Sequence, residues 1–540
     1  RTILTLILFV ISTNLIISQD MTRTWAIENL NNPSPGYLNF DYTGGFSFFL
    51  VDHYGNEPFT YPLRDNMTPF RFLKDGNWLL NGKDYFFVMN QNYQLIDSFP
   101  HPTEYKVDFH EVEMLSNGNL IMLCTEERIM DLSKYLEGGS KNANVISAVI
   151  IETDNHGIIK WTWKALDHFN INDATEDVDL TQNTIDFTHA NSICEDLDGN
   201  LIVSFRHFDE ITKIKKTNGE IIWRMGGSKC KNNQFVFDND DNAGFFGFSH
   251  QHTATILPNG NLLVFDNGNL RKPNYSRAIE YEIDANSKRV KKVWEYRNSP
   301  DIYSSMMGSV KRLSNGNTLI NWGSKKISEI KPDNTIAMEL VYNNNNKYAI
   351  YRADKVFSHL DAVTKNIAPN SDFSFADGTF DTGIKLKVNN QTGGNKLTVV
   401  YHKYSPPKAE YQDSSFAEVL PARWVFQTDN TMTINGKINL RTAFLDTQLI
   451  PSKVSFYKRD KETQGVFKRL QTTVNQNTNE IEASFSGLGE LVLVNHKLTR
   501  VKLISPESDS KNVSLEGSFI WEKVKGAESY QLQASTTIDF

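Results

Sequence analysis

A short turn motif recurs five times and constrains the fold more than any other feature of this 540-residue chain. Each copy places Asn-Gly or Asp-Gly between two apolar runs, a pattern typical of a tight β-hairpin. The copies lie at residues 73–79, 115–120, 197–201, 257–262 and 313–319. Helical periodicity is nearly absent between them, so the motif predicts an all-β chain.

A second signature often follows the first. It is a polar turn and then an apolar run that ends in Trp, as in residues 154–161, 217–223 and 284–294. Two hairpins in each unit give four antiparallel strands, and units of this kind repeated about every 40–60 residues are typical of a β-propeller. A solenoid is the alternative, but solenoid repeats are usually shorter and pair their strands between repeats.

The turn motif accounts for five blades, and residues 36–63 read as a sixth that lacks one strand. Residues 347–356 could supply that strand from the far end and close the ring, which would remove an exposed sheet edge. We therefore expect a six-bladed propeller over residues 30–356.

The ends of the chain have different patterns. Residues 357–499 read as a β-sandwich accessory domain. Residues 501–540 resemble the opening strands of a fibronectin type III module, which would be truncated here. Residues 1–19 hold a short apolar run, 3–17, before Ser18, which predicts a signal peptide, with an uncleaved anchor as the alternative. No later stretch is apolar enough to span a membrane, so we expect a secreted, periplasmic or cell-surface protein.

Charge and cysteine content narrow the partners. The formal net charge of -8 and the pI of about 5.9 argue against a nucleic-acid partner, although a few buried cationic groups can still bind a small anion. Three cysteines cannot build a disulfide framework.

Three blades carry a histidine at matching positions. His110 and His252 each lie eight residues before the turn glycine, and His189 lies ten before it. An offset of two residues keeps a side chain on the same strand face. Because the first strand of each blade lines the central channel, we expect the three imidazoles to meet at one channel mouth.

Other polar residues fall close to these histidines. Asn191 shares a strand face with His189, and Arg206 lies on the next strand. Three histidines suit zinc, but a guanidinium beside them favours an oxyanion, so we expect neither a metal nor another cofactor. His250 should share a face with His252, which leaves two candidate nucleophiles, and His207 should point away from Arg206.

The sequence around these residues resembles the bacterial, PAPS-independent arylsulfotransferase family. The similar segments follow in order over about a hundred residues, namely 186–192, 204–207, 219–227, 248–254, 265–269 and 276–281. The resemblance implies a secreted or periplasmic six-bladed propeller. It also implies sulfuryl transfer from an aryl sulfate to a phenol through a sulfated histidine.

Carried over residue by residue, the resemblance makes His252 the nucleophile. His110, His189 and Arg206 would complete the catalytic group, with Asn191 and His250 among the substrate-binding residues. Neutral imidazole is a competent nucleophile, and a guanidinium with donor imidazoles can stabilise the sulfuryl oxygens. The partners would be small aryl sulfates and phenols, while the oligomeric state stays open.

Two alternatives remain. A non-enzymatic secreted propeller could bind a ligand or polysaccharide, but it would need no nucleophile. A metal-dependent hydrolase could use the histidines as ligands, and metal analysis would separate the two.

Overall fold

The computed structural model describes residues 25–496 with gaps, together with 503–505, 518, 520 and 521. The gaps lie at 42–46, 57–58, 63–67, 74–76, 91–93, 241–243, 324, 343–349, 357–361, 379, 404, 407–408, 413–415, 429–430, 442–443, 445–452, 476–477 and 479. The chain divides into two compact units, residues 1–360 and 361–540. The predicted signal peptide lies outside the described residues, as does most of the fibronectin-like segment.

The described chain is built of strands, and its helical turns are short 3-10 segments: η1 (Leu132–Lys134), η2 (Ala165–Asp167), η3 (Ile171–Asp173) and η4 (Arg206–Phe208). The prediction of an all-β chain is therefore confirmed. Among the described residues, no helix has the length and apolar character needed to cross a membrane.

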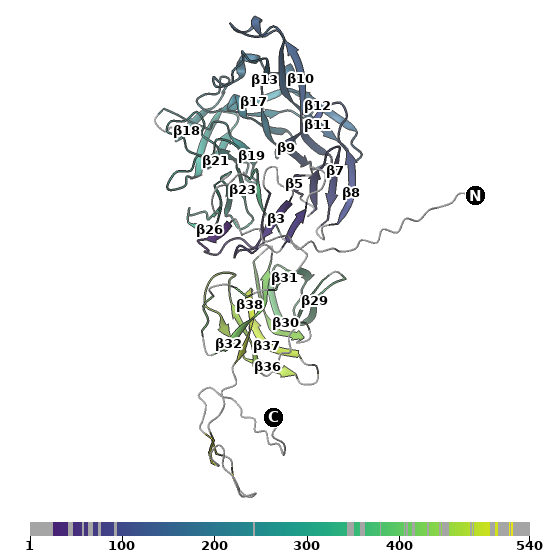
Figure 1. Ribbon diagram of the computed structural model, residues 1–540, viewed down its shortest axis with the longest axis vertical. Helices are drawn as coiled ribbons and strands as arrows, with labels where there is room; N and C mark the ends of the chain where they lie inside the picture. Colours follow the sequence, from purple (N-terminus) through teal and green to yellow (C-terminus); the bar gives the residue numbers. More distant parts are fainter. Residues whose placement is uncertain are drawn as a thin grey trace, which may run out of the picture. The chain divides into compact units, whose positions relative to one another are not determined.

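The described part of the first unit forms six sheets (Figure 1). The first two contain β27 (Ala353–Val356), β2 (Tyr37–Asp41), β3 (Ser47–Val51) and β4 (Phe59–Pro62), then β5 (Thr68–Phe72), β6 (Trp78–Asn81), β7 (Tyr85–Met89) and β8 (Leu95–Pro100). The third contains β9 (Lys106–Met114), β10 (Leu120–Met130), β11 (Ala143–Thr153) and β12 (Ile159–Lys164), with β13 (Thr184–Asp186) parallel to β11.

The next three sheets repeat this order. The fourth contains β14 (Ala190–Glu195), β15 (Leu201–Phe205), β16 (Glu210–Ile214) and β17 (Ile221–Gly226). The fifth contains β19 (His252–Ile256), β20 (Leu262–Asp266), β21 (Arg277–Asp284) and β22 (Arg289–Tyr296), with β18 (Val236–Asp238) parallel to β22. The sixth contains β23 (Ser309–Arg312), β24 (Thr318–Asn321), β25 (Lys326–Ile330), β26 (Ile336–Tyr342) and β1 (Trp25–Glu28).

The repeated turn motif joins the first strand of a sheet to the second. In the third sheet, Gly118 has φ 84° and its N–H donates to Leu115 O, while Leu120 pairs with Met114. Gly260 makes the same contact with Leu257 in the fifth sheet, also at φ 84°. A positive φ costs glycine little, which explains why the motif keeps this residue. The predicted hairpins are confirmed at these turns.

The strand that the first sheet lacks comes from the far end of the unit. β27 pairs antiparallel with β2, with Val356 opposite Tyr37 and Ala353 opposite Phe40. The predicted pairing of these two segments is confirmed, and it links residues more than three hundred positions apart.

Apolar side chains join neighbouring sheets in chain order. Separate buried clusters connect the second sheet to the third, the third to the fourth, the fourth to the fifth, the fifth to the sixth and the sixth to the first. Figure 1 shows β5, β9, β19 and β23 toward the middle of this unit, with β8, β12, β18 and β26 nearer its edge. First strands from several sheets therefore approach one another.

The residues predicted as a β-sandwich form two sheets. One contains β28 (Ala362–Asn366), β31 (Lys396–His402), β32 (Phe416–Gln427), β38 (Gly489–His496), β34 (Val454–Arg459) and β35 (Lys468–Arg469). The other contains β29 (Ser371–Ala376), β30 (Asp381–Gly393), β33 (Met432–Arg441), β37 (Glu480–Ser486) and β36 (Thr472–Asn475). Trp424 and Phe456 from the first share one buried core with Phe375 and Leu440 from the second. In the C-terminal segment, β39 (Leu503–Ser505) pairs with β40 (Ile520–Trp521).

Candidate active site

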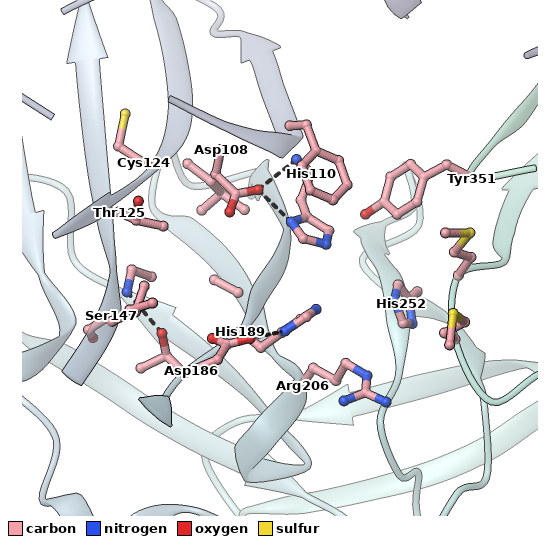
Figure 2. A pocket seen from close by; sticks show the side chains of 18 residues that line it. Asp108, His110, Cys124, Thr125, Ser147, Asp186, His189, Arg206, His252 and Tyr351 are labelled. Atoms are coloured by element: carbon pink, nitrogen blue, oxygen red, sulfur yellow. Dashed lines mark hydrogen bonds and ion pairs between the residues drawn. The ribbon is translucent and has the colours of Figure 1, made fainter. Parts of the chain in front are cut away.

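A cavity of about 530 Å³ gathers polar side chains from the third and fifth sheets and from the segments beside β14, β15 and β27. His110 comes from β9, His189 precedes β14, Arg206 begins η4 and His252 begins β19. Tyr351, which lies just before β27, completes this group (Figure 2). The ring centroids of His110 and His189 are 5.0 Å apart, and that of Tyr351 lies 5.6 Å from His110 and 6.3 Å from His252. The structure thus brings the three matched histidines and Arg206 to one cavity.

A pairing irregularity accompanies each of the three histidines. The ladder between β9 and β10 shifts register between Val112 and Val107, around His110. The ladder that begins at Ala190, beside His189, and the one that begins at His252 also shift at these ends. His189 itself has φ 43°. Such bulges redirect side chains and are common beside active sites, so strand alternation alone does not place these rings.

The surroundings of His252 fix its tautomer. Its Nδ1 lies 2.7 Å from Asn267 Oδ1 and 3.1 Å from His250 O, and both oxygens are acceptors. Asn267 is held in that orientation because its Nδ2 donates to Ser304 O and Met307 O, each over 2.8 Å. Nδ1 therefore carries the proton, and the lone pair resides on Nε2.

His252 is also held neutral. Its side chain is buried, with 3% of the residue exposed. Burial lowers its pKa well below the ordinary value, and the charges of Arg206, His110 and His189 act in the same direction against the Asn267 hydrogen bond. A neutral imidazole with a free Nε2 is the form that can attack an electrophile.

The other two histidines have carboxylates where His252 has an amide. His110 Nδ1 donates to Asp108 Oδ1, and His189 Nδ1 donates to Asp186 Oδ2. This pairing keeps the proton on Nδ1 of each ring and leaves each Nε2 to exchange a proton or contact a ligand. The three imidazoles consequently have unequal chemistry.

Arg206 adds a fixed positive charge to the cavity. Its Nη2 donates to Ser305 O over 3.3 Å. Burial lowers its pKa, opposed by the charges of Asp177, Asp209 and Asp186, yet a guanidinium stays protonated at neutral pH. With the histidines beside it, the cavity is suited to the oxygens of a small anion.

Two predicted binding residues lie elsewhere. Asn191 is fully buried, and its Nδ2 donates to Gln251 O over 2.7 Å, next to His252. His250 precedes β19 with φ 55°, and its ring contacts Asp177 and Asp209. The expectation that His250 and His252 share a strand face is wrong, because the strand begins only at His252. Neither Asn191 nor His250 lines the cavity.

His207 also differs from its predicted place. Its Nδ1 donates to Asp186 O over 2.7 Å, and its ring centroid lies 4.7 Å from that of His189. Burial lowers the pKa of His207 to about 4, so this ring is neutral at pH 7. The 3-10 turn η4 carries both Arg206 and His207 toward the site, whereas alternation along a strand would have separated them.

A metal could be held at one edge of this cluster. Donor atoms of Asp186, His189 and His207 all lie within 4.8 Å of one another. Histidine and carboxylate are suitable zinc ligands, but the Arg206 charge nearby opposes a cation. These residues therefore fit an anion better than a metal.

Three contributors were missed from the sequence. Asp108 lies two residues before His110, and Asn267 lies in a segment that reads as a turn. Tyr351 lies in the segment that was considered only as a closing strand. Its hydroxyl donates to Asn191 O over 3.1 Å, and burial raises its pKa, so it stays a neutral phenol. Of the three, only Asp108 lies close enough in sequence to His110 to have been recognised as its partner.

The family model for arylsulfotransferase (ASST) matches residues 27–366, so the chain belongs to that family. Among curated proteins, it is 30% identical over 171 residues to arylsulfate sulfotransferase AssT from Escherichia coli O6:H1, which covers 25% of this chain and 27% of that protein. It is 31% identical over 113 residues to the AssT of Lelliottia amnigena, which covers 19% of this chain and 17% of that protein. The matched region thus spans about a quarter or less of these relatives.

Solved structures are more distant. A Bacteroides caccae protein of unknown function matches at 15% identity and a TM-score of 0.38, covering 59% of this chain and 98% of that one. The β-propeller domain of Cps50 (Swd1) from Myceliophteria thermophila matches at 8% identity and a TM-score of 0.32, covering 60% of this chain and 89% of that one. Scores this low carry no functional assignment.

Proposed function

We propose that the protein transfers a sulfuryl group from an aryl sulfate to a phenol, with His252 as the nucleophile. Membership of the arylsulfotransferase family supports this activity at the level of the family. The single observation that carries the assignment is the neutral His252, whose Nε2 is left unprotonated by Asn267 beside the Arg206 guanidinium.

In the first step, Nε2 of His252 attacks the sulfur of the donor. An N–S bond forms and the S–O bond to the aryl group breaks, with the electron pair leaving on the aryl oxygen. His110 or His189, acting as the imidazolium, gives that oxygen its Nε2 proton and becomes neutral, while its Nδ1–H stays hydrogen-bonded to its carboxylate. Arg206 stabilises the charge on the sulfuryl oxygens.

In the second step, the acceptor phenol loses its proton to the same histidine. Its oxygen attacks sulfur, an S–O bond forms and the N–S bond breaks, which returns neutral His252. Tyr351 is a poor acceptor by comparison, because its hydroxyl already donates to Asn191 O and burial raises its pKa.

Apolar side chains around the cavity suit an aryl substrate. Phe109 is 54% exposed and stacks on His110 with ring centroids 4.1 Å apart, and Met306, which also lines the cavity, is 59% exposed. Both side chains line the cavity that contains Arg206, so an aryl group can contact them while its sulfate reaches that guanidinium.

We propose that the six sheets form one six-bladed propeller, with this cavity at one mouth of its channel. The shared buried clusters and the pairing of β27 with β2 support that arrangement. The apolar segment 3–17 supports export to the periplasm or cell surface.

The test uses p-nitrophenyl sulfate with phenol and without PAPS. Release of p-nitrophenol together with phenyl sulfate is expected from the wild type. His252→Asn should abolish it, whereas His156→Asn, at an exposed position outside the cavity, should not. Full turnover by folded His252→Asn would refute this nucleophile. Donor labelled in the sulfate should leave label on the wild type after acid-free denaturation.

A metal-dependent hydrolase is the second candidate, because Asp186, His189 and His207 lie close together. Pretreatment with EDTA separates the two. Unchanged transfer to phenol supports the sulfotransferase, whereas loss that zinc restores supports the hydrolase. A protein that binds aryl sulfates without turnover would instead be the ligand-binding propeller.

A further inference from the structure

His250 lies between two carboxylates behind the candidate active site. Its Nε2 is 2.8 Å from Asp177 Oδ2, and its Nδ1 is 3.0 Å from Asp209 Oδ1. Its backbone N–H also donates to Asp209 Oδ1, over 2.7 Å. A neutral imidazole has one N–H and can donate to one carboxylate, so contacts at both nitrogens favour the imidazolium where both carboxylates are ionised. Burial raises the pKa of Asp209, and the hydrogen bonds and charge of His250 oppose that rise.

The charged and titratable groups around this ring come from two segments. Asp177 lies in the loop after η3, whereas Arg206, His207 and Asp209 lie in or beside η4. The neutral hydroxyl of Ser249 also lies 3.3 Å from His250 Nδ1. Burial alone would lower the pKa of His250, but the hydrogen bonds to Asp177 and Asp209 raise it, against the repulsion from Arg206. Although burial opposes it, the His250 hydrogen bond holds the pKa of Asp177 well below its usual value.

The same carboxylates act on Arg206. After burial, which lowers the pKa of this guanidinium, the charges of Asp177 and Asp209 have the largest effects and raise it. Asp209 ends the η4 turn with φ 50°, and its N–H donates to Arg206 O. On the other side, His250 O accepts from Nδ1 of His252. His250 therefore connects the turn that carries Arg206 to the segment that carries His252.

We infer that His250 is a positioning residue whose positive charge offsets Asp177 and Asp209, so that the cavity keeps its attraction for a sulfuryl anion. This role deepens the proposed function and rests on it. It also removes His250 as a nucleophile, because neither ring nitrogen has a free lone pair. Without this imidazolium, two carboxylates would face Arg206 and compete with the substrate for its charge.

The experiment compares His250→Gln with a charge-restoring double variant. His250→Gln should raise both the KM for p-nitrophenyl sulfate and the inhibition constant of inorganic sulfate about tenfold, the scale of one added charge a few ångströms from a partly buried site. Its kcat should change much less. Adding Asp177→Asn should return both constants toward the wild-type values.

Asp179→Asn is the matched control for the second substitution. Asp179 is exposed and contacts Thr181 and Gln182, so its removal should not rescue His250→Gln. Wild-type sulfate affinity in folded His250→Gln would overturn the inference. A double variant no better than the single one would overturn the charge role as well.

The wild type provides a test that does not depend on these variants folding. In protein labelled with ¹⁵N-histidine, His250 should show both ring nitrogens protonated at neutral pH, and sulfate affinity should fall as the pH rises through its titration. A neutral His250 at pH 6 would overturn the inference. If the wild type transfers no sulfuryl group, the proposed function fails, but calorimetry with inorganic sulfate still decides the role of His250.

Discussion

The ring of His252 donates from Nδ1 to the side-chain oxygen of Asn267, a neutral amide, over 2.7 Å. His110 and His189 face carboxylates instead. An amide acceptor fixes the tautomer of His252 without adding charge. This contrast is the reason why we propose His252 as the nucleophile.

Replacing Asn267 should therefore affect His252 in two distinguishable ways. Asn267→Leu removes the acceptor and should reduce kcat about a hundredfold, as loss of an orienting partner does elsewhere. Asn267→Asp keeps an acceptor but adds charge, which raises the pKa of His252 and moves the acid limb of kcat/KM to higher pH. Rates of p-nitrophenol release from pH 5 to 8 measure both. Equal profiles for wild type and Asn267→Asp would contradict this assignment.

Protonation of His252 should also be visible in stability. Its pKa is lowered in the folded state, so below about pH 6.5 the unfolded chain binds a proton that the folded protein does not. Between pH 7.5 and 5.5 the wild type should lose up to about 1.4 kcal/mol more unfolding free energy than His252→Asn. Urea titrations at the two pH values measure this. Parallel losses would mean that His252 titrates normally.

His250 should have the opposite pH dependence. Its pKa is raised in the folded state, so its contribution to stability is complete below about pH 6.5 and is lost as the pH rises through the folded value. His250→Gln should then be destabilised most at acidic pH and approach the wild type at alkaline pH. Urea titrations of both proteins from pH 5.5 to 9 provide the comparison, and a constant difference would argue against a charged His250.

Phe109 offers a test of aryl recognition. Phe109→Ala removes an exposed ring beside His110 and should raise the KM for p-nitrophenyl sulfate about three- to tenfold, the range of one aromatic contact. The inhibition constant of inorganic sulfate should stay unchanged, because that ligand has no ring. Tyr135→Ala, at an exposed position outside the cavity, is the control. A matching rise for sulfate would indicate a general disturbance of the site.

The segment before β27 should be important for stability. Arg352 donates to both oxygens of Glu111, over 2.8 and 2.6 Å, and Glu111 is fully buried. Arg352→Met removes both of these donors from a fully buried carboxylate and should lower the free energy of unfolding by about 3–5 kcal/mol. Lys311→Met breaks the more exposed pair with Asp354 and should cost less than about 1 kcal/mol. Chemical denaturation compares the two, and similar losses would contradict the difference in burial.

Much of the first unit could be predicted from local chemistry. The Gly118 and Gly260 turns follow from a conformation that favours glycine, and the pairing of β27 with β2 follows from a unit that lacked one strand. The matched histidines could be found because a repeat relates their positions. Such features depend on residues close together in sequence or on internal repeats, and both can be recognised from the sequence alone.

The finer geometry could not be predicted in this way. His250 was given the face of His252 by strand alternation, yet the chain has a positive φ there and the strand begins two residues later. His207 approaches His189 because η4 replaces an extended segment. Tyr351 reaches the cavity, and Asn267 reaches His252, from segments distant in sequence from His110. Bulges, turns and long-range packing decide these positions, and single-sequence periodicity contains none of them.

Tyr351 reaches the cavity from the segment that precedes β27, and β27 completes the sheet begun by β2. During synthesis, a nascent chain contains His110, His189 and His252 well before it contains Tyr351 and β27. A ribosome-bound or prematurely released fragment would thus hold His252 without a finished pocket. Under the proposed function, sulfuryl transfer would begin only once the last strand has docked, so activity would report complete folding.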